Sequence, residues 1–292
     1  MKKTLMLLAV LQIVTLSLFA GNTITKKYNF GAVKSIDAGS IYEIEVIEGK
    51  QKEVTIVCDP SLQEHLDVKY FHGELILSMK PNTKIVNGNG EGVKVYLQME
   101  TIEELDLSGA AKLKADGQFK NNEVDMELSG ASSAKITNIS GNSISIECSG
   151  ASKLDIADCN FSSVEIDASG ASNLHITSSR NNNLEIEASG ASKVKMHSVG
   201  RHTETSCSGA SKIILTGETD LFRSETSGAS NLTAQDFHAK NGYAEVTGAS
   251  NAKIKCSGDL KVMVSKIAKL THYGNPNIIN IDTESNIRKG DD

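Results

Sequence analysis

The chain has 292 residues and a formal net charge of −6 at pH 7. An acidic chain attracts neither nucleic acid nor an anionic membrane surface, so we expect neither as a partner. With 24 glycines, 3 prolines and no tryptophan, the composition favours a β-rich repeat over a disordered linker.

Residues 1–20 predict a signal peptide. Lys2 and Lys3 precede an uncharged stretch that ends at Ala20, a small residue at the expected cleavage point. This stretch is short for a membrane span and no second one follows, so we expect no transmembrane segment in the mature chain. Loss of the two lysines would change the formal charge from −6 to −8. The expected location is the periplasm, the outer-membrane surface or the medium.

Residues 21–100 predict a β-rich lead-in. Alternating apolar and polar residues indicate strands at 42–47, 53–58, 74–79 and 92–97, with one helical turn at 60–66. Glycines and asparagines between 82 and 92 indicate a loop. We expect this region to continue into the next part of the chain and to cap its first edge, because an open edge invites pairing between chains.

Residues 101–276 repeat one short motif at a constant interval. Ser149-Gly150-Ala151-Ser152 is one copy, and its glycine position recurs every 19 to 21 residues. A constant period near twenty indicates a solenoid. The glycines of the successive copies are Gly109, Gly130, Gly150, Gly170, Gly190, Gly209, Gly228 and Gly248. A last degenerate copy has Lys266 at the glycine position.

Each repeat has an alternating strand before the motif and a shorter one after it. In one repeat the inward positions are Ile144, Ile146 and Cys148. These features predict an all-β fold, a right-handed parallel β-helix with rungs of about 20 residues and a β-rich N-terminal capping region. The alternative is a β-propeller, whose blades of about 40 residues would each need two repeats.

The repeated glycines are interpreted as structural turn residues. Glycine adopts positive φ without a Cβ clash, so Gly150 and its equivalents let the chain turn sharply. The neighbouring serines are expected to bond nearby backbone groups. We expect the array to end near 261–264, with 274–276 as a terminating turn and residues 277–292 as a loosely ordered polar tail.

The five cysteines do not predict a disulfide framework. An odd number leaves one unpaired in an exported protein. Cys148 and Cys207 occupy equivalent positions three repeats apart, which places them roughly 14 Å apart in a stack of strands, beyond the reach of a disulfide. We interpret both as small buried hydrophobic residues.

An acidic ladder is predicted on the outer face just before the turn. It comprises Glu127, Glu147, Asp167 and Glu187, and continues after Ser206 with Glu225 and Glu245. A second row two positions earlier comprises Asp125, Ser145, Glu165, Glu185 and Glu204. The ladder is either a solvated face that discourages aggregation or a face that binds Ca²⁺ or a polysaccharide. Across the turn, Lys112, Lys153, Lys193 and Lys212 would partly offset its charge.

No residues are assigned a catalytic or cofactor-binding role. Cysteine and histidine do not cluster with metal-ligand spacing, so no cofactor is expected, with Ca²⁺ on the ladder as the one alternative. Pectin-degrading enzymes built on β-helices need carboxylates beside Arg, Lys or His in a long groove. Arg180, Arg201 and Arg223 are scattered, and the connections are too short to build groove walls. We therefore predict that the protein is not an enzyme.

The leader, the strand-rich lead-in, the repeated Ser-Gly-Ala-Ser unit and the closing Tyr273-Gly274-Asn275-Pro276 together resemble one family. It is the putative auto-transporter adhesin, head GIN domain family of Gram-negative envelopes, and the resemblance covers about residues 29–277. It implies a β-helical exported protein with an adhesive role, and supplies no catalytic or binding residues.

The resulting hypothesis is a non-enzymatic, exported, adhesin-like protein of the cell envelope. Its repetitive surface would bind or scaffold a partner such as a surface glycan or an envelope protein. A carbohydrate-active lyase or hydrolase on the same fold, and a calcium- or glycan-binding module, are the alternatives.

Overall fold

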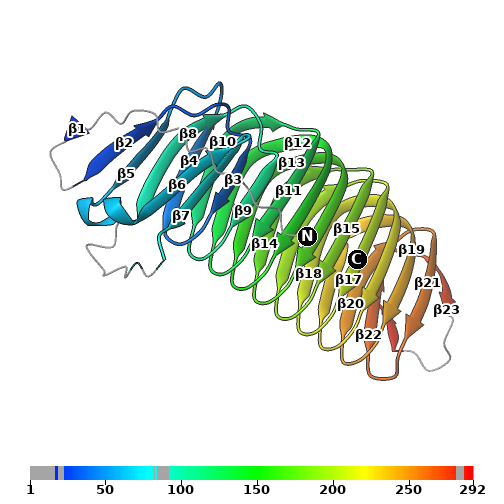
Figure 1. Ribbon diagram of the computed structural model, residues 1–292. Helices are drawn as coiled ribbons and strands as arrows, with labels where there is room; N and C mark the ends of the chain where they lie inside the picture. Colours follow the sequence, from blue (N-terminus) through cyan, green and yellow to red (C-terminus); the bar gives the residue numbers. More distant parts are fainter. Residues whose placement is uncertain (1–16, 19–22, 82, 84–91, 281–285, 292) are drawn as a thin grey trace, which may run out of the picture.

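The protein is a parallel β-solenoid of about nine turns with rungs of roughly 20 residues (Figure 1). The computed structural model describes residues 17–18, 23–81, 83, 92–280 and 286–291. It is 68% strand and 2% helix, which confirms the all-β solenoid prediction. The predicted signal peptide lies outside the described residues except for β1 (Ser17–Leu18), and so does most of the predicted loop at 82–92.

Each rung has two arms that meet at a sharp corner. The arm that enters the corner forms the pre-corner face, and the arm that leaves it forms the post-corner face. Consecutive rungs pair in parallel on both faces, so that Ile146 pairs with Ile166 and Leu154 with Leu174. Inward side chains therefore stack on like side chains along the whole array.

The pre-corner face consists of separate strands and of the second halves of long ones. Its strands are β3 (Ser35–Ala38), β9 (Glu104–Leu107), β11 (Glu123–Leu128), β15 (Asn183–Ala188), β17 (His202–Cys207) and β21 (Asp259–Val264), with the C-terminal halves of β12 (Ser133–Cys148), β13 (Lys153–Ala168), β18 (Lys212–Thr226) and β19 (Asn231–Val246). The N-terminal halves of these four long strands belong to the post-corner face, together with β4 (Tyr42–Glu48), β10 (Lys112–Lys120), β14 (Asn173–Arg180), β16 (Lys193–Val199), β20 (Asn251–Cys256) and β22 (Lys269–Tyr273).

The corner is built by the repeated glycines. All eight have φ between 64° and 70°, the left-handed region that favours glycine. The amide of Ala151 donates to the carbonyl oxygen of Gly130 at 2.7 Å, and the same bond recurs from rung to rung. A Cβ added at Gly150 would lie 2.6 Å from that oxygen, closer than a carbon can approach. The corner therefore requires glycine for its backbone angle and for its spacing.

The last serine of the motif points into the solenoid beneath the corner. Ser230 is buried, and its hydroxyl donates to the carbonyl oxygen of Cys207 at 2.9 Å and to that of Ser227 at 2.6 Å. Ser211 makes the equivalent pair of bonds one rung earlier, to Ala188 and Ser208. These bonds tie one corner to the rung before it, as second hydrogen bonds to carbonyl oxygens that also accept from backbone amides.

The stack continues into the predicted lead-in, where β3 and β4 form the rung next to the array. β4 pairs in parallel with β10 on one side and with β8 (Val93–Met99) on the other, and β3 lies between β9 and β7 (Glu74–Met79). Its corner carries Ser40 at the position of the glycines, with φ of 65°. The amide of Ala110 donates to the carbonyl oxygen of Ser40 at 2.7 Å, so the hydrogen-bonded corner begins here.

The N-terminal end is closed by antiparallel strands. β2 (Ile24–Tyr28) pairs with β5 (Val54–Cys58), β5 pairs with β8, and β6 (Leu66–Phe71) pairs with β7. A 3-10 helix at Pro60–His65, where the sequence indicates a helical turn, begins at an Asp59 side chain that accepts from the amide of Ser61. This cap ends the parallel stack and covers its first edge.

The C-terminal residues continue the stack. β23 (Asn277–Asn280) pairs in parallel with β21, and β24 (Ile287–Lys289) pairs with β22. The prediction of a loosely ordered tail from residue 277 is therefore wrong for these segments, because Ile278 and Ile287 pack against the core and hold them in the stack. At the last corner Lys266 does not take positive φ, while Ala268 still donates to the carbonyl oxygen of Ser265 at 3.1 Å.

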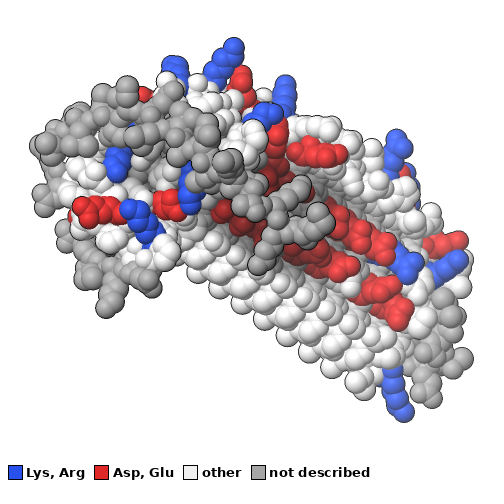
Figure 2. All heavy atoms as spheres, in the orientation of Figure 1, with Lys and Arg blue, Asp and Glu red and all other residues white. Residues whose placement is uncertain are grey.

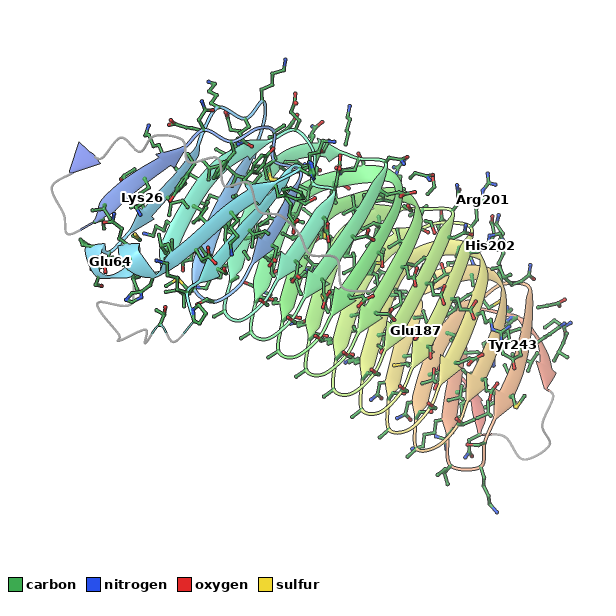
Figure 3. The ribbon with its side chains drawn as sticks, viewed as in Figure 1. Lys26, Glu64, Glu187, Arg201, His202 and Tyr243 are labelled. Carbon is green, nitrogen blue, oxygen red and sulfur yellow. The ribbon has the colours of Figure 1, made fainter. Side chains whose placement is uncertain are left out.

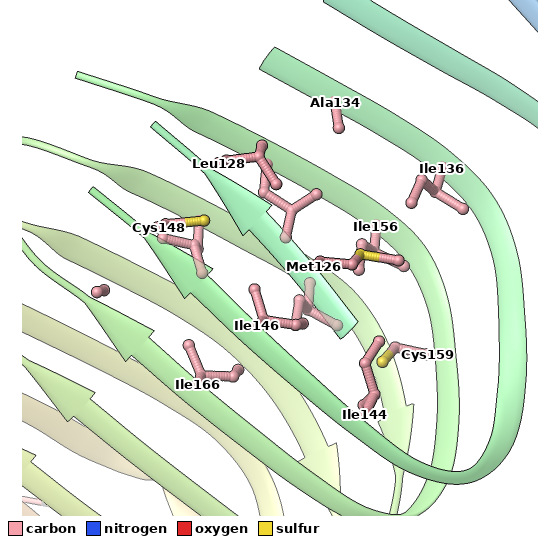
Figure 4. Close-up of a cluster of buried hydrophobic side chains, with 14 of the residues drawn as sticks. Met126, Leu128, Ala134, Ile136, Ile144, Ile146, Cys148, Ile156, Cys159 and Ile166 are labelled. Atoms are coloured by element: carbon pink, nitrogen blue, oxygen red, sulfur yellow. The ribbon is translucent and has the colours of Figure 1, made fainter. Parts of the chain in front are cut away.

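All five cysteines are buried and free, as small residues of the core. Cys148 and Cys207 are separated by Ala168 and Ala188 along one row of the pre-corner strands. Figure 4 shows Cys148 beside Leu128 and Ile146, all pointing inward. Burial raises the pKa of the Cys148 and Cys159 thiols to about 12, so both thiols are protonated and unreactive at neutral pH.

Candidate functional site: two charged faces

The acidic ladder runs in register along the pre-corner face. Glu127 pairs with Glu147, Glu147 with Asp167, and Asp167 with Glu187. Since adjacent parallel strands lie about 4.8 Å apart, these carboxylates project side by side into solvent. The row also extends toward the N-terminus through Asp106 and Asp37, which the sequence did not assign to it.

A second acidic row lies two residues earlier on the same strands. Its members in order are Glu104, Asp125, Ser145, Glu165, Glu185 and Glu204. Figure 2 shows a band of acidic side chains along the solenoid, and Figure 3 labels Glu187 of the first row. Among the described residues, none of the carboxylates of either row from Glu104 to Glu187 forms an ion pair.

The band ends at a cluster around Arg223. Its guanidinium lies 3.2 Å from Glu204 and 3.0 Å from Glu225, and it covers the ring of Tyr243 at 5.1 Å. Arg223 and Tyr243 occupy the second row directly after Glu204. The repeat spacing contains this information, but the sequence interpretation treated Arg223 as one of three scattered arginines. The structure does not bring Arg180 or Arg201 to this cluster.

Burial, together with neighbouring negative charge, raises the pKa of three carboxylates of the two rows. Partial burial raises the pKa of Glu185, and the charges of Glu165 and Glu204 on the neighbouring strands raise it further. At the N-terminal end of the band, burial raises the pKa values of Asp37 and Asp106, and each carboxylate is next to the other in the row. The folded protein therefore favours proton uptake at Asp37, Asp106 and Glu185.

The surface of the band is shallow. A depression of about 400 Å³ lies over β13, β15, β17 and β18, lined by Glu165, Glu185, His202, Glu204, Leu221 and Arg223 among others. A smaller one of about 90 Å³ lies next to the corner, between Asp167, Glu187 and Ser206. Neither has the walls that would enclose a small molecule, so the geometry suits contact with an extended partner.

The carboxylates do not converge on one point. In the described part of the chain no three His, Cys, Asp or Glu side chains are grouped so that they would hold a metal ion. The reason is geometric, since stacked strands hold their outward side chains parallel, whereas Ca²⁺ needs six to eight oxygens around one centre.

The post-corner face carries lysines in the same arrangement. One row reads Lys112, Ser133, Lys153, Asn173, Lys193 and Lys212, and its neighbour reads Lys114, Lys135, Asp155, His175 and Lys195. Lys112, Lys114 and Lys153 form ion pairs with Glu43, Asp116 and Asp155. Lys193, Lys195 and Lys212 are exposed and form no ion pair within the described residues. The two faces therefore carry opposite charge.

The histidines of the post-corner face do not form a catalytic arrangement with the acidic band. His175 lies 3.6 Å from Asp155, and His197 Nδ1 lies 3.0 Å from Thr216 Oγ1, both on the face opposite in charge to the band. None of the helical segments described is long and apolar enough to cross a membrane.

A stacked parallel β-solenoid with one acidic and one basic face defines the protein as a surface-presenting repeat domain. Residues 32–202 and 164–276 match the family described as putative auto-transporter adhesin, head GIN domain, and the chain belongs to this family. None of the curated proteins compared with the chain is significantly similar to it.

Two solved structures share the fold. A putative adhesin from Parabacteroides merdae ATCC 43184 is 13% identical, with a TM-score of 0.53 over 93% of this chain and 97% of that one. A putative adhesin from Parabacteroides distasonis ATCC 8503 is also 13% identical, with a TM-score of 0.51 over 92% of this chain and 95% of that one. At this identity the likeness shows the fold alone.

Proposed function

We propose that the protein is a non-enzymatic, exported protein of the cell envelope whose solenoid presents a long binding surface to a surface glycan or an envelope protein. The observation that carries this proposal is the uninterrupted acidic band, which follows the solenoid from Asp37 to Glu187. Membership of an adhesin family supports the same role.

Repetition is the property that such a surface offers. Each rung presents an equivalent side chain about 4.8 Å after the last, so a partner with its own linear repeat makes many weak contacts at once. The shallow depressions on the band provide width for such a chain without enclosing a reacting group.

A glycan array probed with the purified chain, with and without EDTA, tests this function. We expect retention on a subset of envelope glycans without cleavage, and loss of retention for the variant Glu165→Gln/Glu185→Gln. The matched control is Lys193→Gln/Lys195→Gln, which changes the same number of charges on the other face. Cleaved glycan would contradict a non-enzymatic role, and EDTA-sensitive retention would assign a cation to the ladder.

Export has a separate test. We expect a mature protein that begins at Gly21 when the full chain is expressed in a Gram-negative host and its N-terminus is read by mass spectrometry. The matched variant Leu8→Arg/Leu11→Arg places charge in the apolar stretch and should leave Met1 or Lys2 at the N-terminus. An intact leader on the unaltered chain would contradict export.

A further inference from the structure

The two faces of the solenoid leave opposite charges unneutralised within the molecule. On the pre-corner face Asp167 and Glu187 form no ion pair, and on the post-corner face Lys193 and Lys212 form none in the described residues. Asp167 and Glu187 lie on adjacent strands of the pre-corner face, and Lys193 and Lys212 lie on adjacent strands of the post-corner face. Each face therefore keeps its full attraction for a surface of the opposite sign.

The two faces also share one period. Both are formed by the same stack of rungs, so their charged rows advance by the same distance of about 4.8 Å per strand. A partner with a different repeat would lose register with the carboxylates after a few rungs. A second copy of this chain keeps register along the whole contact, whichever way the two solenoid axes run.

Two copies of the chain would repel each other if they met through the same face. A symmetric contact through two pre-corner faces would bring unpaired carboxylates such as Glu147 and Glu165 together, and repulsion between like charges costs several kcal/mol. The complementary contact joins the pre-corner face of one copy to the post-corner face of another. Such a contact is heterologous, so it leaves a free face on each side and can continue.

We propose that the protein self-associates side by side, with the acidic band of one copy on the lysine rows of the next. The carboxylates of Glu147, Asp167 and Glu187 face Lys193, Lys195 and Lys212 of the neighbouring copy. This inference concerns the purified chain alone and stands independently of any glycan or envelope partner.

Sedimentation velocity of the full chain at two salt concentrations tests the proposal. The range of electrostatic attraction falls from about 30 Å at 0.01 M salt to about 3 Å at 1 M. We expect the weight-average mass at low salt to exceed that at high salt by at least about twofold, since an open contact grows with concentration. A monomer at both salt concentrations overturns the proposal.

Paired charge reversals identify the faces. Asp167→Lys/Glu187→Lys alone and Lys193→Glu/Lys212→Glu alone should each weaken association at low salt by at least about tenfold, because like charges then meet. An equimolar mixture of the two variants should recover it, since the reversed faces complement each other.

The control is Lys50→Glu/Lys52→Glu, which makes the same change of charge as the lysine reversal, but at exposed positions outside both faces. It should associate like the unaltered chain. Association of either reversal variant at the unaltered strength, or a mixture that stays monomeric, overturns the proposal. The salt comparison on the unaltered chain holds whether or not the variants fold.

Discussion

The carbonyl oxygen of Gly150 accepts a hydrogen bond from the amide of Ala171 at 2.7 Å, and a Cβ added at Gly170 would lie 2.6 Å from the same oxygen. The same carbonyl oxygen thus joins two consecutive corners by a hydrogen bond and excludes a side chain at Gly170. Corners that stack closely enough to form this bond can hold only glycine at this position.

Gly170→Val tests this contact. The valine would have to adopt φ near 64° and displace the corner before it, so we expect the free energy of unfolding to fall by several kcal/mol, on the order of 3. Chemical denaturation monitored by circular dichroism measures the change. An unaltered midpoint would rule out the corner as the origin of the stacking.

Ser40→Gly is the opposite change at the first corner. Ser40 already has φ of 65°, the left-handed value that the glycines adopt at the later corners. Glycine relieves the left-handed strain and adds backbone entropy to the unfolded chain, so we expect a net gain of at most about 1 kcal/mol. A loss of stability in the same denaturation experiment would show that the serine side chain supports the corner.

Stability should rise as the pH falls from neutral toward the ordinary carboxyl range near about 4. The pKa values of Asp37, Glu74, Asp106 and Glu185 are raised in the folded protein, with burial as the first cause. A raised carboxyl pKa means that the folded state takes up protons before the unfolded state, so the cost of burying these charges, and their repulsion, is relieved as the pH drops through the folded pKa. Melting temperatures at a series of pH values and low salt measure this effect.

Glu185→Gln separates the ladder from other titrating groups. The variant should melt at a higher temperature than the unaltered chain at pH 7, and the difference should shrink as the pH falls through the raised pKa of Glu185. High salt should also reduce it, because Glu185 is exposed and its repulsion is screened. Equal melting temperatures at pH 7 and low salt would mean that the stacked carboxylates do not strain the fold.

The thiols report on opening of the solenoid. All five cysteines are buried, and burial raises the pKa of Cys148 and Cys159 to about 12. We expect a thiol reagent at neutral pH to label none of them in the folded chain and all five after denaturation. Fast labelling of the native protein would show that the stack opens locally.

The repeat array could be predicted from sequence because one motif specifies each rung. Glycine recurs at a constant interval, and alternation around it predicts the row of inward residues just before the corner, from Leu107 to Val246, but not buried residues of the connections such as Phe119 and Phe237. The rung at 35–48 could not be recognised, because its corner reads Ala38-Gly39-Ser40 and has serine at the left-handed position. In the sequence, the strands of the cap lie between this rung and the first rung of the array, so the twenty-residue period is interrupted there.

The charged faces were predictable only in part. Register follows from the period, so the row from Glu127 to Glu187 could be placed on one face in advance. The Arg223 cluster depends on how far a long side chain reaches toward Glu204 and across Tyr243. The C-terminal strands depend on whether Ile278 and Ile287 find a groove at the end of the core. The spacing of residues in the sequence does not give the conformation of the Arg223 side chain or the packing of Ile278 and Ile287 against the core.

The position of β4 in the stack has a consequence for the order in which the protein folds. Ile44 pairs with Val95 on one side and with Leu113 on the other, so both neighbours of β4 are synthesised after it. Rungs of the array need only the chain about twenty residues away, and short loops close fastest. We expect protection of the array amides to precede that of β4 in pulse-labelled hydrogen exchange, so that the rung that comes first in the sequence forms after the array.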